Sequence, residues 1–222
     1  MHESGRVSFR SKWFIGLLLL PELVVGLIWG CQRLEAAGKA GRETAPVSEG
    51  GLPRLGTVPA FWLTDQEGRT FSEKNLEGQV WVAAFIFTRC PTICPEMTRR
   101  MRALQEQAKA KSLPLHLVSF SVDPENDTPQ VLRAYTTQQG LDTKSWWFLT
   151  GDSAVIRSTA ENGFKIGIDG TANPSAPDYG ITHGTHFVLL DAQRTIRGYY
   201  QSSEPTQVTQ LLEDAAKLVA ER

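Results

Sequence analysis

The sequence predicts an α/β fold for residues 57–222, with a central, mostly parallel sheet, helices on both faces and an antiparallel hairpin towards the C-terminus. Two observations support this prediction. Short apolar runs of strand length alternate with amphipathic segments of helix length, a pattern that favours parallel strands joined by crossover helices. The 222-residue chain is also 41% hydrophobic and 21% charged, which is enough apolar material for a packed core.

The first half of this domain frames the most distinctive motif of the chain. Residues 60–71 read as a short strand, a glycine-containing turn and a second extended piece. Residues 79–87, QVWVAAFIF, are continuously apolar, so we expect a central strand covered on both faces. Residues 95–111 are expected to form a helix, because their apolar side chains recur every three to four positions.

The alternation of strands and helices continues to the C-terminus. Residues 127–140 should form a helix that Asp127 or Thr128 caps, with Pro129 at its first position and Gly140 at its end. The other expected elements are strands at 114–122 and 146–151, a short helix at 152–163, a hairpin of 185–191 with 195–200, and a C-terminal helix at 204–222. With a cysteine pair between a buried strand and the next helix, this order is typical of a thioredoxin-like fold.

The N-terminal region predicts attachment to a membrane. Residues 1–12 are basic, and the apolar run WFIGLLLLPELVVGLIWG follows at 13–30. The run is either an uncleaved transmembrane anchor or a lipoprotein signal that is cleaved before a lipidated Cys31. Both alternatives place the rest of the chain outside the cytoplasm, since basic residues stay on the cytoplasmic side. Residues 31–56 have few large apolar side chains and are expected to be a flexible tether.

The charge and cysteine content exclude two classes of protein. The net charge of −1 gives no sign of nucleic-acid binding, which favours a basic patch and a high pI. Three cysteines allow at most one disulfide within the chain, so this is not a disulfide-rich scaffold. With Cys31 assigned to the membrane-proximal region, Cys90 and Cys94 remain for the chemistry of the domain.

Cys90 and Cys94 lie in the stretch FIFTRCPTICPEM, between the central strand and the next helix. A helix N-terminus favours anions, and the nearby Arg89 adds positive charge, so both features enrich the thiolate. Thiolates can bind a metal, exchange with a disulfide or form an inert bridge. The bridge is the least favoured of these, because closing so short a loop stabilises a fold only weakly.

A two-thiolate site suits the soft Cu(I) ion, and a neutral imidazole could complete it. His2 precedes the apolar run, and His116 lies within an apolar strand. His183 and His186 are three residues apart, so in one extended stretch they would point to opposite faces and at most one would face the cysteines. His183 is favoured because it stands beside Gly184 on an expected loop before the strand, and the role of His186 stays open.

Three motifs in register resemble the Sco/SenC family. The stretch FTRCPTICP is similar to the family's FxxTxCPxxCP, SVDPENDTP to its SxDPxxDTP, and THGTHFVLLD to its DHSxxxYLxD. The resemblance covers roughly residues 57 to 220. It implies a thioredoxin-like domain that binds copper through Cys90, Cys94 and His183 and delivers it to the binuclear copper A centre in subunit II of cytochrome c oxidase.

Some members of this family are thought to act instead as thiol-disulfide reductants for the cysteines of that subunit. In such a role Cys90 would attack and Cys94 would resolve the mixed disulfide. With the N-terminal segment, the resemblance implies a domain on the periplasmic side of a bacterial inner membrane. The chain departs from the family where Thr92 and Ile93 fill the gap between the cysteines, which often holds an aspartate, and where Thr182 replaces the aspartate before the histidine.

Overall fold

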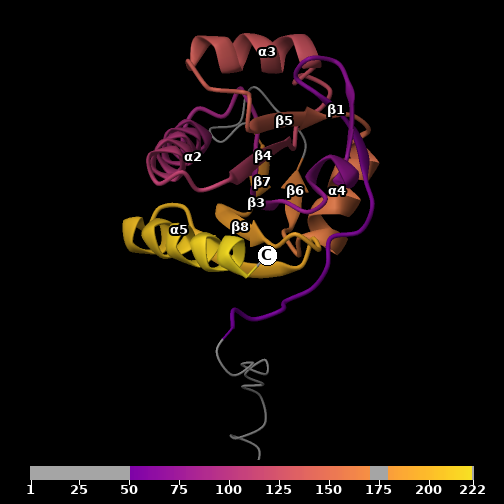
Figure 1. Ribbon diagram of the computed structural model, residues 1–222. Helices are drawn as coiled ribbons and strands as arrows, with labels where there is room; N and C mark the ends of the chain where they lie inside the picture. Colours follow the sequence, from indigo (N-terminus) through magenta and orange to yellow (C-terminus); the bar gives the residue numbers. More distant parts are fainter. Residues whose placement is uncertain (1–50, 171–179, 222) are drawn as a thin grey trace, which may run out of the picture. The chain divides into compact units, whose positions relative to one another are not determined.

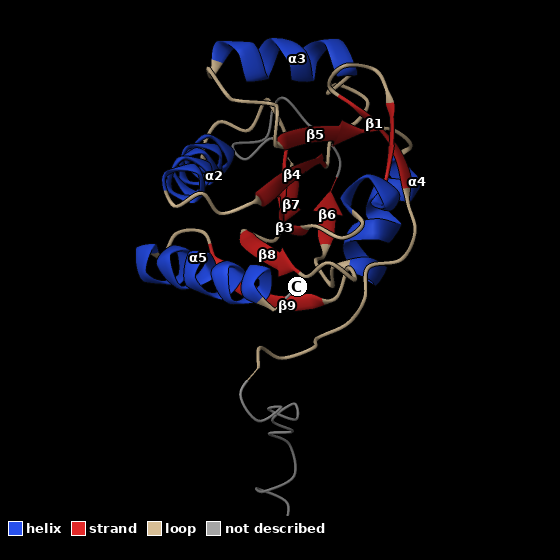
Figure 2. Cartoon of the chain, in the orientation of Figure 1, coloured by secondary structure: helices blue, strands red, loops and turns tan. Residues whose placement is uncertain are grey.

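The computed structural model describes residues 51–170 and 180–221, all within one compact unit, Pro46–Arg222. A seven-stranded sheet forms its centre, in the order β2-β1-β5-β4-β3-β8-β9 (Figures 1 and 2). The expected anchor at 13–30, Cys31 and the tether up to residue 50 lie outside the described residues. Within the described ranges, no helix combines the length and the apolar character needed to span a bilayer.

The sheet is mixed, which corrects the prediction of a mostly parallel one. Only the β3–β4 and β4–β5 pairs are parallel, because these are the neighbours joined by helical crossovers. The other pairs, β1–β2, β1–β5, β3–β8 and β8–β9, are antiparallel. The seven strands are β1 (Trp62–Asp65), β2 (Thr70–Ser72), β3 (Val80–Ile86), β4 (Leu115–Ser121), β5 (Trp146–Thr150), β8 (His186–Leu190) and β9 (Ile196–Gln201).

The helices cover the sheet as expected, with one change. In Figure 1, α2 and α5 lie side by side on one side of the sheet and α4 lies on the other. The helices are α2 (Ile93–Ala110), α3 (Pro129–Gln138), α4 (Ser153–Ser158) and α5 (Pro205–Ala220), with a 3-10 turn η1 (Glu73–Leu76). The helix expected at 152–163 is shorter than predicted, since its second half becomes a π-helical turn, η2 (Thr159–Gly163).

Strand β3 is buried along all seven of its residues, as its continuous apolar sequence predicted. Its Phe85 stacks on Phe120 of β4 with ring centroids 5.2 Å apart. From the helix side, Met97 and Met101 of α2 are 0% and 1% exposed. Burying each side chain of this size is worth about 1.5–3 kcal/mol. The strand end that presents the cysteine motif is therefore held rigidly from both faces.

Two details refine the predicted elements. Residues 52–56 pack along β9, where the amide of Leu55 donates to Ile196 (2.8 Å) and Arg197 donates to the carbonyl of Leu52 (2.7 Å). These contacts add the segment to a domain that was expected to begin at residue 57. At the start of α3, Thr128 provides the cap by accepting from the amide of Val131 (3.4 Å).

Candidate metal and redox site

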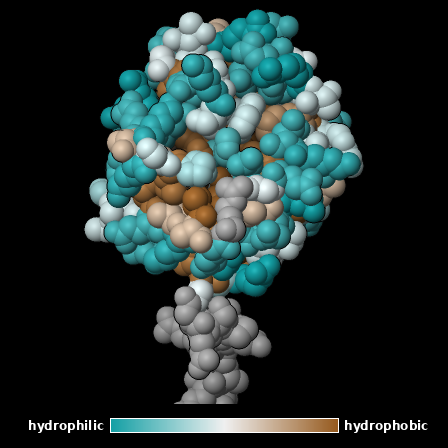
Figure 3. All heavy atoms as spheres, viewed as in Figure 1, coloured by the Kyte–Doolittle hydropathy of each residue, from teal (hydrophilic) through white to brown (hydrophobic). Residues whose placement is uncertain are grey.

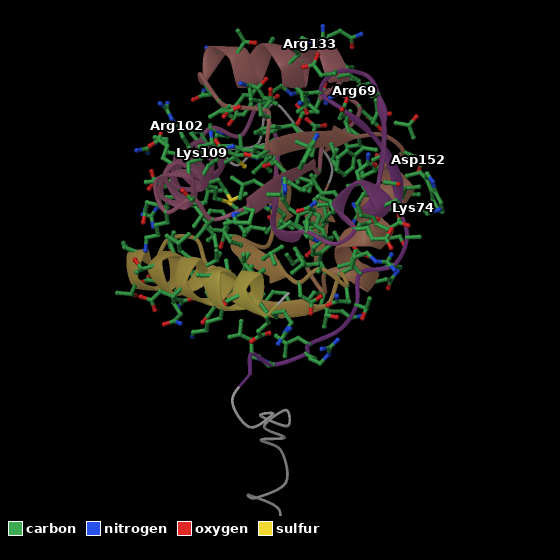
Figure 4. The ribbon with its side chains drawn as sticks, in the orientation of Figure 1. Arg69, Lys74, Arg102, Lys109, Arg133 and Asp152 are labelled. Atoms are coloured by element: carbon green, nitrogen blue, oxygen red, sulfur yellow. The ribbon has the colours of Figure 1, made fainter. Side chains whose placement is uncertain are left out.

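The two cysteines lie where the buried strand β3 passes into α2. Cys90 occupies the loop after the strand, and Cys94 is the second residue of the helix. Their side chains are 7% and 1% exposed, and both are free thiols. Pro95 fits because the first turn of a helix has amides without an intrahelical partner. Sulfur atoms in Figure 4 lie between α2 and the sheet, whereas the labelled Arg102 and Lys109 project outward from α2.

Cys90 takes the place of a capping side chain. Thr92 precedes α2 without making a side-chain cap, and the amide of Cys94 instead donates to the Cys90 sulfur (3.4 Å). A hydrogen bond from the Cys94 thiol and the amides at the helix start lower the pKa of Cys90 from 9.0 to about 5, against the opposing effect of burial. Cys90 is therefore a thiolate at neutral pH.

Cys94 behaves in the opposite way. Its hydrogen bond to Cys90 and its own burial raise the pKa of Cys94 well above that of an ordinary thiol. At neutral pH the pair therefore holds one proton, on Cys94. A nucleophilic, more exposed sulfur and a protonated, fully buried partner stand next to each other.

His183 completes the group. Its Nε2 lies 3.6 Å from the Cys94 sulfur, and its Nδ1 lies 3.1 Å from the carbonyl oxygen of Gly184. A carbonyl only accepts, so Nδ1 carries the proton and the lone pair of Nε2 faces Cys94. Burial lowers the pKa of His183, which keeps the ring neutral. The Phe87 ring packs against it in a T-shaped arrangement, with centroids 6.0 Å apart.

The prediction that His183 lies on a loop was wrong. It ends a short strand, β7 (Ile181–His183), which pairs antiparallel with β6 (Ile168–Gly170) in a separate two-stranded sheet. The Gly184 carbonyl that orients the ring was also missed. The sequence did hold a sign of this close contact, namely the glycine at position 184. A Cβ at this position would lie 2.9 Å from Ile166, and only glycine lets the backbone approach so closely.

The other histidines are placed elsewhere. His116 stacks on Trp147, with ring centroids 5.5 Å apart. His186 begins β8 opposite Gln201, and His2 lies outside the described residues. The ring that faces Cys94 is that of His183.

The three side chains are close together but are not arranged as a finished coordination site. Among residues 51–170 and 180–221, no three His, Cys, Asp or Glu side chains already stand as a set that could hold a metal ion. The Cys90 sulfur and the His183 ring both approach Cys94 rather than a shared central point. The donor set of two sulfurs and a neutral imidazole suits a soft ion, and the side chains would have to turn toward a common centre to bind it.

The sequence around this site matches the model of a known protein family. The model described as SCO1/SenC matches residues 52–220, from the segment on β9 to the end of α5. The chain belongs to the SCO1/SenC family. The match includes both cysteines and His183, so the site lies within the part of the chain that defines the family.

Three solved structures of this family are similar to the chain. A SCO1/SenC family lipoprotein from Bacillus anthracis str. Ames is 35% identical, with a TM-score of 0.68 over 74% of this chain and 96% of that one. BsSco, a member of the Sco family of cytochrome c oxidase assembly proteins with an identified disulfide switch, is 32% identical, with a TM-score of 0.67 over 77% and 98%. Yeast Sco1 with copper bound is 25% identical, with a TM-score of 0.60 over 71% and 87%.

Proposed function

We propose that this SCO1/SenC member is a membrane-tethered, extracytoplasmic copper carrier that delivers copper to the copper A centre in subunit II of cytochrome c oxidase. The observation that carries the proposal is the cluster of a Cys90 thiolate, Cys94 and a neutral His183 whose Nε2 is 3.6 Å from the Cys94 sulfur. The copper-bound structure of a family member and the oxidase-assembly role of another support the cargo and the target.

In this proposal the three side chains have different tasks. Cys90 offers a thiolate without any change of protonation. Cys94 must release its proton when it becomes a ligand, so binding copper at neutral pH liberates about one proton per ion. His183 adds a neutral nitrogen, which favours Cu(II) more than a site of two sulfurs alone does. Copper then passes to the acceptor by exchange of these ligands.

Delivery needs an acceptor held nearby. We assign residues 13–30 to the anchor or lipoprotein signal and the following stretch to the tether, so that the domain faces subunit II across a short distance. A similar protein of this family is a lipoprotein, which supports attachment through Cys31 as one of the two alternatives. On the face shown in Figure 3, apolar side chains are visible between α2 and α5, within a surface that is otherwise mostly hydrophilic.

The test uses the full-length chain in detergent with Cys31→Ser, so that Cys90 and Cys94 are the only thiols. Titration with Cu(I) and with Cu(II) should give one bound ion per chain, and the loaded protein should transfer it to a copper A domain. The proposal fails if Cys90→Ser binds as much copper as the unsubstituted protein.

A second function is favoured by the unequal pKa values of the two cysteines. A thiol-disulfide reductase needs an attacking thiolate and a resolving thiol, and here Cys90 is the thiolate and Cys94 keeps the proton. Cys90 would attack a partner disulfide and displace one partner thiolate. Cys94 would then attack Cys90, lose its proton and release the second partner thiolate. The partner gains two electrons, and Cys90 and Cys94 end as a disulfide.

His183 separates the two functions. It is not needed for disulfide exchange, so His183→Ala should leave the rate of partner reduction unchanged while it weakens Cu(II) binding. If His183→Ala leaves Cu(II) affinity unchanged, His183 is not a copper ligand.

A further inference from the structure

The segment from Ser121, the last residue of β4, to Thr128, the cap of α3, has no role in the proposed site, although it lies beside the cysteine loop. It carries two carboxylates, those of Asp123 and Asp127, which are 4% and 0% exposed. Burying a carboxylate is costly unless hydrogen bonds satisfy it. The identity of the donors therefore shows what these two side chains hold in place.

Asp127 holds the residue two positions before Cys90. It accepts from the amide of Thr88 (3.0 Å) and from the Thr88 hydroxyl (2.5 Å). It also accepts from the hydroxyl of Ser121 (2.6 Å). Asp127 stands just before α3, where an aspartate commonly caps the helix, but Thr128 provides that cap. The Asp127 side chain turns instead toward the cysteine loop.

Asp123 holds the residue immediately before Cys90. Its carboxylate accepts from the guanidinium of Arg89 (2.8 Å) and from the side-chain amide of Asn126 (2.7 Å). Its backbone amide donates to the Ser121 hydroxyl (3.1 Å), so Ser121 links the backbone of Asp123 to the carboxylate of Asp127. Two consecutive loop residues are thus bound by two neighbouring buried acids.

We infer that Asp127 and Asp123 are positioning residues that fix the Thr88–Arg89 turn and so set the place of the Cys90 sulfur relative to Cys94. The inference rests on the proposed function insofar as Cys90 and Cys94 are the working thiols, whether for copper or for disulfide exchange. These contacts are made in the dithiol form of the protein. A disulfide requires the two sulfurs to move to bonding distance, whereas the clamp is seen with both thiols free, so we expect the clamp to stabilise the dithiol state.

The test compares variants of the full-length chain in detergent, all with Cys31→Ser, in a glutathione redox buffer. Asp127→Asn and Thr88→Val should each shift the equilibrium constant of the Cys90–Cys94 pair about tenfold toward the disulfide, which corresponds to about 30 mV. Thr88→Ser keeps the hydroxyl and should restore the original constant. The Cu(I) affinity of Asp127→Asn should fall by a similar factor.

Asp191→Asn is the matched control. Asp191 is also a buried carboxylate that holds a turn, through the amides of Gln193 (3.0 Å) and Thr195 (2.8 Å), and it pairs with Arg197 (3.0 Å). It follows β8 next to the start of β3, at the opposite end of that strand from Cys90. The Asp191→Asn substitution should lower the melting temperature of the protein without changing the redox equilibrium of Cys90 and Cys94.

Two results would overturn the positioning role. One is a dithiol–disulfide equilibrium that stays unchanged, or shifts toward the dithiol, in both Asp127→Asn and Thr88→Val. The other is an equal shift of the redox equilibrium in Asp191→Asn, which would show that the effect comes from a general loss of stability. The redox measurement needs no copper, so it tests the positioning role independently of the copper function. The copper function is rejected by a different result, an unsubstituted protein that binds no copper ion.

Discussion

The hydrogen bond between the two cysteines is the contact whose removal should have the largest chemical effect. A fall in the pKa of Cys90 from 9.0 to about 5 corresponds to about 5 kcal/mol in favour of the thiolate, and the Cys94 thiol is its largest cause. Cys94→Ala removes that donor and leaves the amides at the start of α2. The pKa of Cys90 should therefore rise well above 5 and stay below 9.0.

The assay is the rate of alkylation of Cys90 by iodoacetamide as a function of pH, in protein with Cys31→Ser and with the modified residue assigned by mass spectrometry. The midpoint of the pH profile is the quantity to compare, because the intrinsic nucleophilicity of a thiolate falls with its pKa and partly masks changes in rate. The matched control is Cys94→Ser, whose hydroxyl can still donate to the sulfur.

The expected midpoints are near pH 5 for the unsubstituted protein, similarly low for Cys94→Ser, and clearly higher for Cys94→Ala. A midpoint near 9 in the unsubstituted protein would refute the thiolate at Cys90. A low midpoint that survives in Cys94→Ala would show that the helix amides alone stabilise the charge, and the assignment of the shared proton would then be wrong.

Three further outcomes follow from the same structure. His183→Ala should weaken Cu(II) binding more than Cu(I) binding in a competition titration, and the control His186→Ala should change neither by more than about twofold, which is under 0.5 kcal/mol. Gly184→Ala places a Cβ 2.9 Å from Ile166, so it should displace the carbonyl that orients His183 and lower Cu(II) affinity, with no change in the alkylation midpoint of Cys90. Thr128→Ala removes the cap of α3 and should lower the free energy of unfolding by about 1 kcal/mol in urea denaturation, without an effect on copper.

Local patterns in the sequence predicted the elements that frame the cysteines. The continuous apolar run of β3 and the helical spacing of α2 are visible without any knowledge of tertiary contacts, and so is the position of Cys90 between them. Unequal proton affinities of the two cysteines could not be assigned in the same way. They depend on the hydrogen bond from the Cys94 thiol to the Cys90 sulfur and on the burial of Cys94, and both are decided by the path of the loop.

The features that the sequence did not predict depend on contacts between residues far apart along the chain. Strands β6 and β7 have three residues each, too few for a periodic pattern, so the short sheet that carries His183 left no signal. The direction of β8 beside β3 depends on the connection through the whole chain, and the mixed sheet was missed for that reason. Asp127 looked like a helix cap because the sequence shows its neighbours along the chain, whereas its partner Thr88 is 39 residues away.

Copper delivery as proposed requires Cys90, Cys94 and His183 to bind one copper ion together. X-ray absorption spectroscopy of the copper-loaded, full-length chain with Cys31→Ser tests it most directly. The Cu(II)-loaded protein is expected to hold one ion per chain, with two sulfur ligands and one imidazole nitrogen, and His183→Ala is expected to lose the nitrogen signal. A spectrum without sulfur ligands, or one that Cys90→Ser leaves unchanged, would show that copper is not bound at these cysteines.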